Sequence, residues 1–93
     1  MAKVKFFYVS GCPYCAQARK AREELIQENP EYKKVEFEEI DEGKHPDIAD
    51  RYDYYATPAM FVNEEKIYEA HIGEKYDEAK ENVKKVMDAA LRA

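Results

Sequence analysis

The sequence predicts an α/β fold in which helices cover both faces of a four-stranded mixed sheet. Short stretches of aromatic and β-branched residues, typical of strands, alternate with segments whose apolar residues recur every three or four positions, as in helices. These segments follow the order β-α-β-α-β-β-α. A chain of 93 residues is also too short to divide between two hydrophobic cores. We therefore expect a single domain over residues 1–93.

The first forty residues predict a strand, a helix and a second strand. Residues 3–9 become almost entirely apolar toward their end, which is typical of a strand covered on both faces. Ser10-Gly11 interrupts this strand, and Pro13 suits the first position of a helix because its missing N–H costs nothing there. The helix should end at Asn29-Pro30, and residues 35–40 should form the second strand.

The rest of the chain predicts a short helix, a hairpin and a long helix. Pro46 opens the short helix, which must end before Pro58. Residues 59–62 and 66–70 form the hairpin around a turn near Asn63-Glu64, although this turn lacks the Asn-Gly pair that is typical of tight hairpins. From Glu74 onward the apolar residues follow a 3.6-residue period over about four turns, which predicts an amphipathic helix.

Composition and charge exclude several classes of function. Hydrophobic residues make up 45% and charged residues 38% of the chain, which excludes a disordered or low-complexity protein. The net charge of −5 argues against nucleic acid as a partner. Apolar runs are far shorter than the roughly 20 residues of a membrane span, and no signal-peptide pattern follows the basic start. We expect a cytoplasmic monomer that binds neither nucleic acid nor a membrane.

The chemistry of the chain points to its two cysteines, Cys12 and Cys15. A disulfide between them closes too small a loop to add much stability. Three residues apart in a first helical turn, their Cα atoms lie about 5–6 Å apart, which suits a disulfide that opens and closes. Cys12 meets the unpaired N–H groups at the helix start, which favour a thiolate, while Cys15 is more shielded. Cys12 should therefore attack a substrate disulfide, and Cys15 should release the product.

Positive charge gathers around these cysteines. Residues 1–22 hold five basic residues and no acidic one. This charge either keeps the protein in solution or recruits an anionic substrate. Arg19 and Arg22 lie one to two helical turns beyond Cys15, roughly 10–15 Å along the axis, where solvent largely screens them. We expect the helix start, and not these arginines, to dominate the pKa of Cys12.

A metal site is the alternative explanation of a Cys-x-x-Cys pair. A structural zinc needs four ligands, and the remaining candidates, His45 and His71, lack metal-ligand spacing. We predict no metal site within one chain and expect both histidines to be structural or exposed to solvent. An iron-sulfur cluster or copper ion bridged between two chains stays open, because each chain could supply two thiolates.

The Ser10-Gly11-Cys12-Pro13-Tyr14-Cys15 segment after a strand, together with Thr57-Pro58 before another, resembles the glutaredoxins of the thioredoxin-like superfamily. The resemblance covers nearly the whole chain. It implies a thioredoxin-like fold with Cys12 as the nucleophile and Cys15 as the resolving thiol. It also implies a cis bond between Thr57 and Pro58, beside which the substrate backbone pairs with the protein.

The C-terminal half is more similar to thioredoxin. Glutaredoxins usually carry Gly-Gly in the second hairpin strand, where this chain has Tyr68-Glu69. We expect these side chains to hinder glutathione binding, because they block close approach and add negative charge. Gly73 corresponds to the glycine of the thioredoxin protein-binding groove. The chain lacks tryptophan, however, and has Phe6 where thioredoxin has a buried aspartate.

These observations predict a thiol-disulfide oxidoreductase that reduces protein disulfides. The residues expected to contact substrate are Pro13, Tyr14, Thr57, Pro58 and Gly73. Tyr52, Tyr54 and Tyr55 either pack at the edge of the sheet or form an aromatic rim for a peptide. No organic cofactor should be tightly bound, and the electrons come from a thioredoxin-reductase-type enzyme or from glutathione. A glutathione-dependent glutaredoxin is the nearest alternative.

Overall fold

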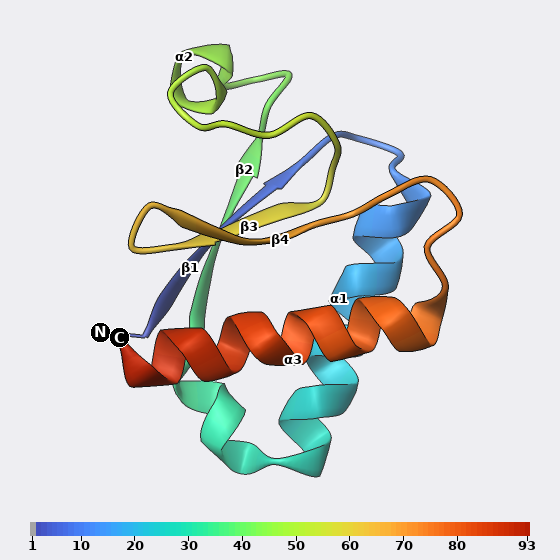
Figure 1. The fold of residues 1–93 in the computed structure, drawn as a ribbon, viewed down its shortest axis with the longest axis vertical. Coiled ribbons are helices and arrows are strands. Elements are labelled where there is room, and N and C mark those ends of the chain that lie inside the picture. Colours follow the sequence, from blue (N-terminus) through green and yellow to red (C-terminus); the bar gives the residue numbers. More distant parts are fainter. Residues whose placement is uncertain (1) are drawn as a thin grey trace.

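The structure, a computed structural model, describes residues 2–93 and has the predicted order of elements (Figure 1). The strands are β1 (Lys3–Tyr8), β2 (Glu36–Asp41), β3 (Ala59–Val62) and β4 (Glu65–Glu69). The helices are α1 (Pro13–Glu28), α2 (Pro46–Ala49) and α3 (Tyr76–Arg92). The strands form one sheet in the order β2-β1-β3-β4, in which β1 is parallel to β2 and all other pairs are antiparallel. The predicted mixed sheet is confirmed.

Side-chain alternation along the strands builds a hydrophobic layer on each face of the sheet. On one face Val4, Phe6 and Met60 pack under α1 and α3, two helices that cross each other in Figure 1. On the other face Phe7 and Phe61 pack under α2 and the segment that follows it. Because neighbouring strand residues point to opposite faces, the apolar run in β1 is buried on both sides. Helices on both faces are therefore confirmed.

The face that α1 turns inward consists mostly of small residues. Its buried positions are Cys15, Ala18, Ala21 and Leu25. The deeper layer of α3 is likewise formed by alanine, valine and methionine. In residues 2–93, no helix combines the length and the apolar character that a membrane span requires.

A 3₁₀ helix at Pro30–Lys34 was not predicted from the sequence. Asn29 ends α1 and also begins this turn, since its side chain accepts a hydrogen bond from the N–H of Glu31 at 3.1 Å. Tyr32 is buried, and its hydroxyl donates to Asp88 of α3 at 2.7 Å. The turn therefore connects the end of α1 to α3.

The β3–β4 hairpin contains a β-bulge. Met60 pairs with Tyr68, but the next residue, Phe61, pairs with Lys66, so Ile67 is an extra residue in β4. In a regular strand, residues 66 and 69 would point to opposite faces. The extra residue brings Lys66 and Glu69 to the same face, while Tyr68 points to the other, because bulges redirect side chains in this way.

The hairpin turn places two non-glycine residues in the left-handed region. Val62 pairs with Glu65, which leaves Asn63 and Glu64 as the two loop residues, with φ values of 51° and 68°. Two positive φ values are those of a type I′ turn, the turn that favours Asn-Gly. The turn is tight although its second residue carries a Cβ atom.

We therefore expect Glu64→Gly to stabilise the protein. The left-handed conformation costs a residue with a Cβ atom about 1–2 kcal/mol, and the greater freedom of glycine in the unfolded chain offsets about 0.5–1 kcal/mol of this gain. A net gain of about 0.5–1 kcal/mol raises Tm by about 2–8 °C in calorimetry. Glu65→Gly, one residue later and inside β4, is the control and should lower Tm. An unchanged or lower Tm in Glu64→Gly contradicts the prediction.

Candidate dithiol site

Three loops meet at the N-terminal end of α1: the β1–α1 loop, the segment before β3, and the β4–α3 loop (Figure 1). Cys12 contacts Thr57 of the second loop, and Tyr14 contacts Gly73 of the third. The structure thus brings together the residues that the sequence singles out from three distant parts of the chain. Their roles in catalysis and substrate binding stay predictions.

Cys12 is the N-cap residue of α1, and Pro13 follows it at the first helical position, as predicted. The Sγ atom of Cys12 accepts a hydrogen bond from the backbone N–H of Cys15 at 3.2 Å. Gly11 precedes the cap with a φ of 76°, a conformation that favours glycine. This turn aims the sulfur of Cys12 at the exposed N–H groups of the helix.

Two opposing effects set the pKa of Cys12. Partial burial raises the pKa, because it disfavours the charged thiolate. Hydrogen bonds from the side chains of Cys15 and Thr57, and from the backbone N–H groups of Cys15 and Tyr14, lower the pKa and outweigh burial. The pKa of Cys12 therefore lies below that of an ordinary cysteine, which favours its thiolate.

Cys15 has the opposite character. Its side chain is fully buried, and burial together with the hydrogen bond to Cys12 raises its pKa to about 12. Both cysteines are free thiols in this structure. The site therefore holds one partly exposed sulfur that ionises readily and one buried sulfur that keeps its proton.

Thr57 faces Cys12 through two oxygen atoms. The Sγ atom of Cys12 lies 3.7 Å from the carbonyl oxygen of Thr57 and 3.6 Å from its hydroxyl. The Thr57–Pro58 bond is cis, as the resemblance implies. The hydroxyl can donate to a thiolate, whereas the carbonyl can accept only from a thiol.

Tyr14 and Gly73 are joined directly. The backbone N–H of Gly73 donates to the hydroxyl of Tyr14 at 2.7 Å, and Gly73 has a φ of 86°. The aromatic side chain beside the cysteines therefore holds the β4–α3 loop. Ile72, which precedes Gly73 in this loop, is 94% exposed.

The guanidinium groups of Arg19 and Arg22 bind a partner other than the cysteines. Both guanidinium groups bind Glu39 of β2, at 2.9 Å and 3.0 Å, and they lie over aromatic rings of β1 and β2. Glu39 therefore compensates part of the positive charge of these two arginines. The main contributions to the pKa of Cys12 come from burial and from hydrogen bonds, which agrees with the ranking expected from the sequence.

The aromatic and histidine candidates divide into packed and exposed residues. Tyr52 and Tyr54 pack against Phe7 and Phe61 under α2, so they are structural. Tyr55 is 91% exposed, two residues before Thr57, and is the tyrosine of this group that a substrate can reach freely.

Both histidines are exposed, as predicted. His45 occupies the N-cap position of α2 without a capping hydrogen bond from its side chain, and His71 binds Glu78 at 2.7 Å.

The Tyr68-Glu69 pair differs from expectation. Tyr68 does not stand over the site but is buried beneath α1 and α3, where its hydroxyl donates to Glu74 at 2.6 Å. Among residues 2–93, Glu74 is the charged residue that is buried. The side chain of Asn82 also donates a hydrogen bond to its carboxylate. The sequence did not indicate this contact, because it forms only when the β4–α3 loop brings Glu74 back to Tyr68.

Glu69 contacts the loop before Thr57 and is held there by the protein itself. Its carboxylate accepts hydrogen bonds from the backbone N–H groups of Tyr55 and Ala56, at 2.6 Å and 2.7 Å. It also binds the ammonium group of Lys66 at 2.6 Å. The sequence placed a negative charge here, but it did not indicate that the charge is tied to the loop before Thr57.

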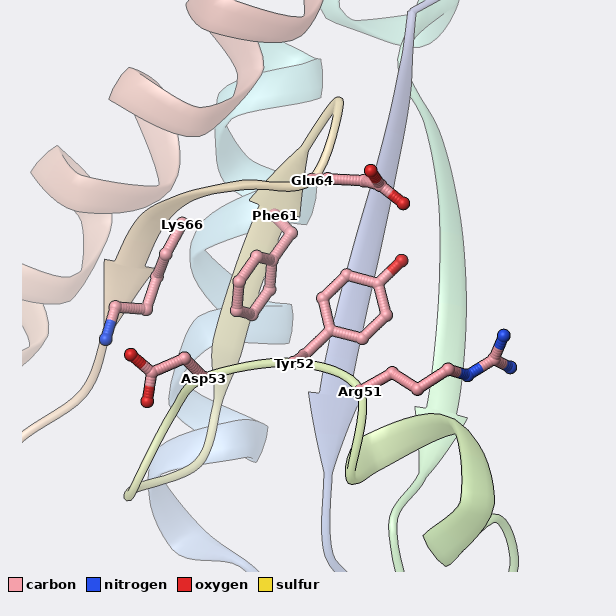
Figure 2. Close-up of a pocket in the computed structure, with 6 residues that line it drawn as sticks. All are labelled: Arg51, Tyr52, Asp53, Phe61, Glu64 and Lys66. Carbon is pink, nitrogen blue, oxygen red and sulfur yellow. The ribbon is translucent and has the colours of Figure 1, made fainter.

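A cavity of about 510 Å³ lies on the α2 side of the sheet (Figure 2). Its lining residues are Arg51, Tyr52, Asp53, Phe61, Glu64 and Lys66. The cysteines, in contrast, lie at the start of α1 on the other side of the sheet, in the layer that includes Cys15. We therefore place the candidate site at the dithiol, where the chemistry is, and not in the cavity.

A mixed four-stranded sheet with two neighbouring cysteines at the start of α1 is the arrangement of thioredoxin-like proteins. A protein with this arrangement is of the thiol-disulfide oxidoreductase type. The sequence model of a family described as the thioredoxin domain matches residues 2–88. The chain therefore belongs to this family, and the predicted membership of the thioredoxin-like superfamily is confirmed.

Solved structures agree with this assignment. A malarial protein is similar with a TM-score of 0.58 and 15% identity, over 89% of this chain and 93% of its own. Thioredoxin 1 from the thermophilic eubacterium Thermosipho africanus TCF52B is similar with a TM-score of 0.54 and 18% identity, over 96% and 98%. At these identities the likeness shows the fold. No curated protein matches the sequence significantly.

The two pKa shifts predict that only Cys12 reacts with iodoacetamide near neutral pH. The thiolate is the reactive form of a cysteine. Cys12 has a pKa below the usual value of a cysteine, whereas Cys15 has a pKa of about 12 and keeps its proton near neutral pH. The measurement is the alkylation rate of the reduced protein against pH, with peptide mass spectrometry to locate the label. Cys12→Ser is the control and should be almost unreactive. Preferential labelling of Cys15 contradicts this assignment.

Proposed function

We propose that this protein reduces disulfide bonds in other proteins, with Cys12 as the nucleophile and Cys15 as the resolving thiol. The asymmetry of the two thiols is the observation that carries the proposal. Cys12 is partly exposed with a lowered pKa, and Cys15 is buried with a pKa raised to about 12. An exposed thiolate beside a shielded thiol favours attack on an outside disulfide by Cys12 first.

The reaction then proceeds in two exchanges. The Cys12 thiolate attacks one sulfur of the substrate disulfide, a mixed disulfide forms, and the other substrate sulfur leaves as a thiolate. Cys15 next gives its proton to the departing substrate thiolate or to water and attacks the Sγ atom of Cys12, which releases the second substrate sulfur and leaves a disulfide between the two cysteines. Two electrons pass from the protein to its substrate. An external reductant then restores the dithiol.

The surface around Cys12 favours a protein as the substrate. Tyr55 and Ile72 are the large hydrophobic side chains that are most exposed in residues 2–93, and each lies next to a loop that reaches the site. We propose that an extended substrate segment passes between these side chains and contacts Pro13, Tyr14, Thr57, Pro58 and Gly73. Exposed apolar side chains beside a reactive group are typical of a protein-binding surface.

Glutathione is the weaker candidate substrate. Glu69 keeps a negative charge beside Thr57, and its carboxylate already occupies two backbone N–H donors there. Lys66 offsets part of this charge, so the occupied N–H donors are the stronger argument against an anionic tripeptide. We propose that a thioredoxin-reductase-type enzyme supplies the electrons, with glutathione as the alternative source, and that the protein acts as a cytoplasmic monomer without a tightly bound cofactor.

The test compares insulin reduction with reduction of a small glutathione mixed disulfide. Wild-type protein should accelerate insulin reduction by dithiothreitol, and Cys12→Ser should return the rate to the uncatalysed level. Cys15→Ser keeps the nucleophile but lacks the resolving thiol, so it should accumulate a mixed disulfide that mass spectrometry detects. Activity retained in Cys12→Ser overturns the proposal.

Two other outcomes decide between the alternatives. Turnover of the glutathione mixed disulfide far above that of insulin, with glutathione and its reductase as the electron source, identifies a glutaredoxin. Absorbance bands of a cluster or copper after anaerobic purification, lost in Cys12→Ser, identify a metal carrier bridged between chains. A folded, reduced protein without such bands that reduces insulin supports the proposal.

We expect Ile72→Ser to weaken the binding of protein substrates and to leave small ones unaffected. Covering about half of an isoleucine side chain contributes about 1 kcal/mol, so KM for insulin should rise roughly fivefold while kcat changes little. The control substrate is a small aromatic disulfide, whose KM should stay constant. A parallel rise of KM for both substrates shows instead that the variant disturbs the site.

A further inference from the structure

Glu69 connects the hairpin to the loop that carries Thr57. Its carboxylate binds two consecutive N–H groups, those of Tyr55 and Ala56, at 2.6 Å and 2.7 Å. Two such bonds to one carboxylate oxygen fix the backbone immediately before Thr57. Hydrogen bonds to an ionised acceptor are about twice as strong as those between neutral groups.

Lys66 holds Glu69 from the other side. The bulge at Ile67 places Lys66 on the same face as Glu69, and their side chains meet at 2.6 Å. Figure 2 shows Lys66 and Asp53 extending to the same end of the cavity, and the negative charges of Glu69 and Asp53 raise the pKa of Lys66. The ammonium group of Lys66 therefore lies next to the carboxylate of Glu69 and stabilises its negative charge.

The carboxylate stays ionised over the working range of the site. Burial raises the pKa of Glu69, but hydrogen bonds from Lys66 and from the N–H groups of Tyr55 and Ala56 lower it below the usual range. Protonation, and with it loss of these contacts, therefore occurs only at acidic pH. The hydrogen bonds between Glu69 and the loop are therefore intact over the pH range in which Cys12 loses its proton.

We propose that Glu69 is a positioning residue for the dithiol, whose carboxylate fixes the segment before Thr57 and so places the Thr57 hydroxyl beside Cys12. The hydroxyl lies 3.6 Å from the Sγ atom, and its hydrogen bond favours the thiolate. Glu69 acts on Cys12 only through Thr57. The inference rests on the proposed role of Cys12 as the nucleophile.

Two effects of Glu69 on Cys12 have opposite signs, which makes the proposal testable. As a nearby negative charge, Glu69 disfavours the thiolate, so its removal lowers the pKa of Cys12. As a positioning residue it favours the thiolate, so its removal raises the pKa. The direction of the change therefore separates positioning from a simple charge effect.

The experiment measures the pKa of Cys12 from the pH profile of iodoacetamide alkylation in Glu69→Ala, Glu69→Gln, Thr57→Val and the double variant Glu69→Ala/Thr57→Val. Loss of one hydrogen bond should shift the ionisation of Cys12 roughly three- to tenfold toward the thiol in Glu69→Ala and in Thr57→Val, so that its pKa rises and the alkylation rate falls by this factor at pH values below the pKa. Glu69→Gln keeps an acceptor oxygen and should show a smaller decrease. If Glu69 acts through Thr57, the double variant should be no slower than Thr57→Val alone.

Glu65→Gln, a neutral change at an exposed position of the same strand, is the control and should leave the rate unchanged. An unchanged or lowered pKa in folded Glu69→Ala overturns the proposal, as does an additive double variant. Should Glu69→Ala unfold, the same comparison is made with Glu69→Gln. Alkylation reports on the thiol itself, so the test remains decisive even if the protein fails to reduce protein disulfides.

Discussion

The backbone N–H of Cys15 donates its hydrogen bond to the sulfur of Cys12, so α1 begins on a thiol where many helices begin on a side-chain oxygen. The rest of the site depends on this contact. It directs the sulfur of Cys12 toward the unpaired N–H groups of the helix, and it leaves Cys15 one turn deeper, against the sheet. The position at which the helix starts therefore makes two identical side chains differ in acidity. The pKa of Cys12 is lowered, and the pKa of Cys15 is raised. Gly11, with its positive φ, and Pro13, at the first helical position, flank the cap and favour a start at this point.

Two loops from the distant half of the chain complete the environment of this helix start. The segment before β3 brings the oxygens of Thr57 to Cys12, and the β4–α3 loop is attached to Tyr14 through Gly73. Both loops are held at a second point by buried or charged contacts of the hairpin: Tyr68 with Glu74 on one face, and Glu69 with the backbone at Tyr55 on the other. The hairpin thus positions both sides of the surface that surrounds the reactive sulfur.

Elements with a strong local signal were predictable from the sequence. The apolar run of β1, the proline at the start of α1 and the period of α3 each reflect a constraint within a few residues, and all three are present. The 3₁₀ helix at Pro30–Lys34 and the bulge at Ile67 were missed. Asn29-Pro30 indicates the end of α1 and equally the start of a new turn, and the bulge depends on how β4 pairs with β3, which the pattern of one strand does not specify. The cysteine pair was recognisable from its spacing, whereas Glu69 and Glu74 were not, since exposed and buried glutamates look alike in a sequence. Their surroundings are defined only when the hairpin, the loop and the helices pack together.

The bulge determines which side chain can pair with the carboxylate of Glu69. In a regular strand, Tyr68 and Glu69 would still point to opposite faces, but Lys66 would lie on the face of Tyr68 and leave the carboxylate without its cation. A partly buried carboxylate without a counter-charge is costly, and it would draw in solvent or a proton instead of holding the loop. With Ile67 as the extra residue, Lys66 reaches Glu69, and the ion pair can bind the backbone before Thr57. The irregularity in the strand is therefore a condition for the loop contact, and through it for the proposed environment of Cys12.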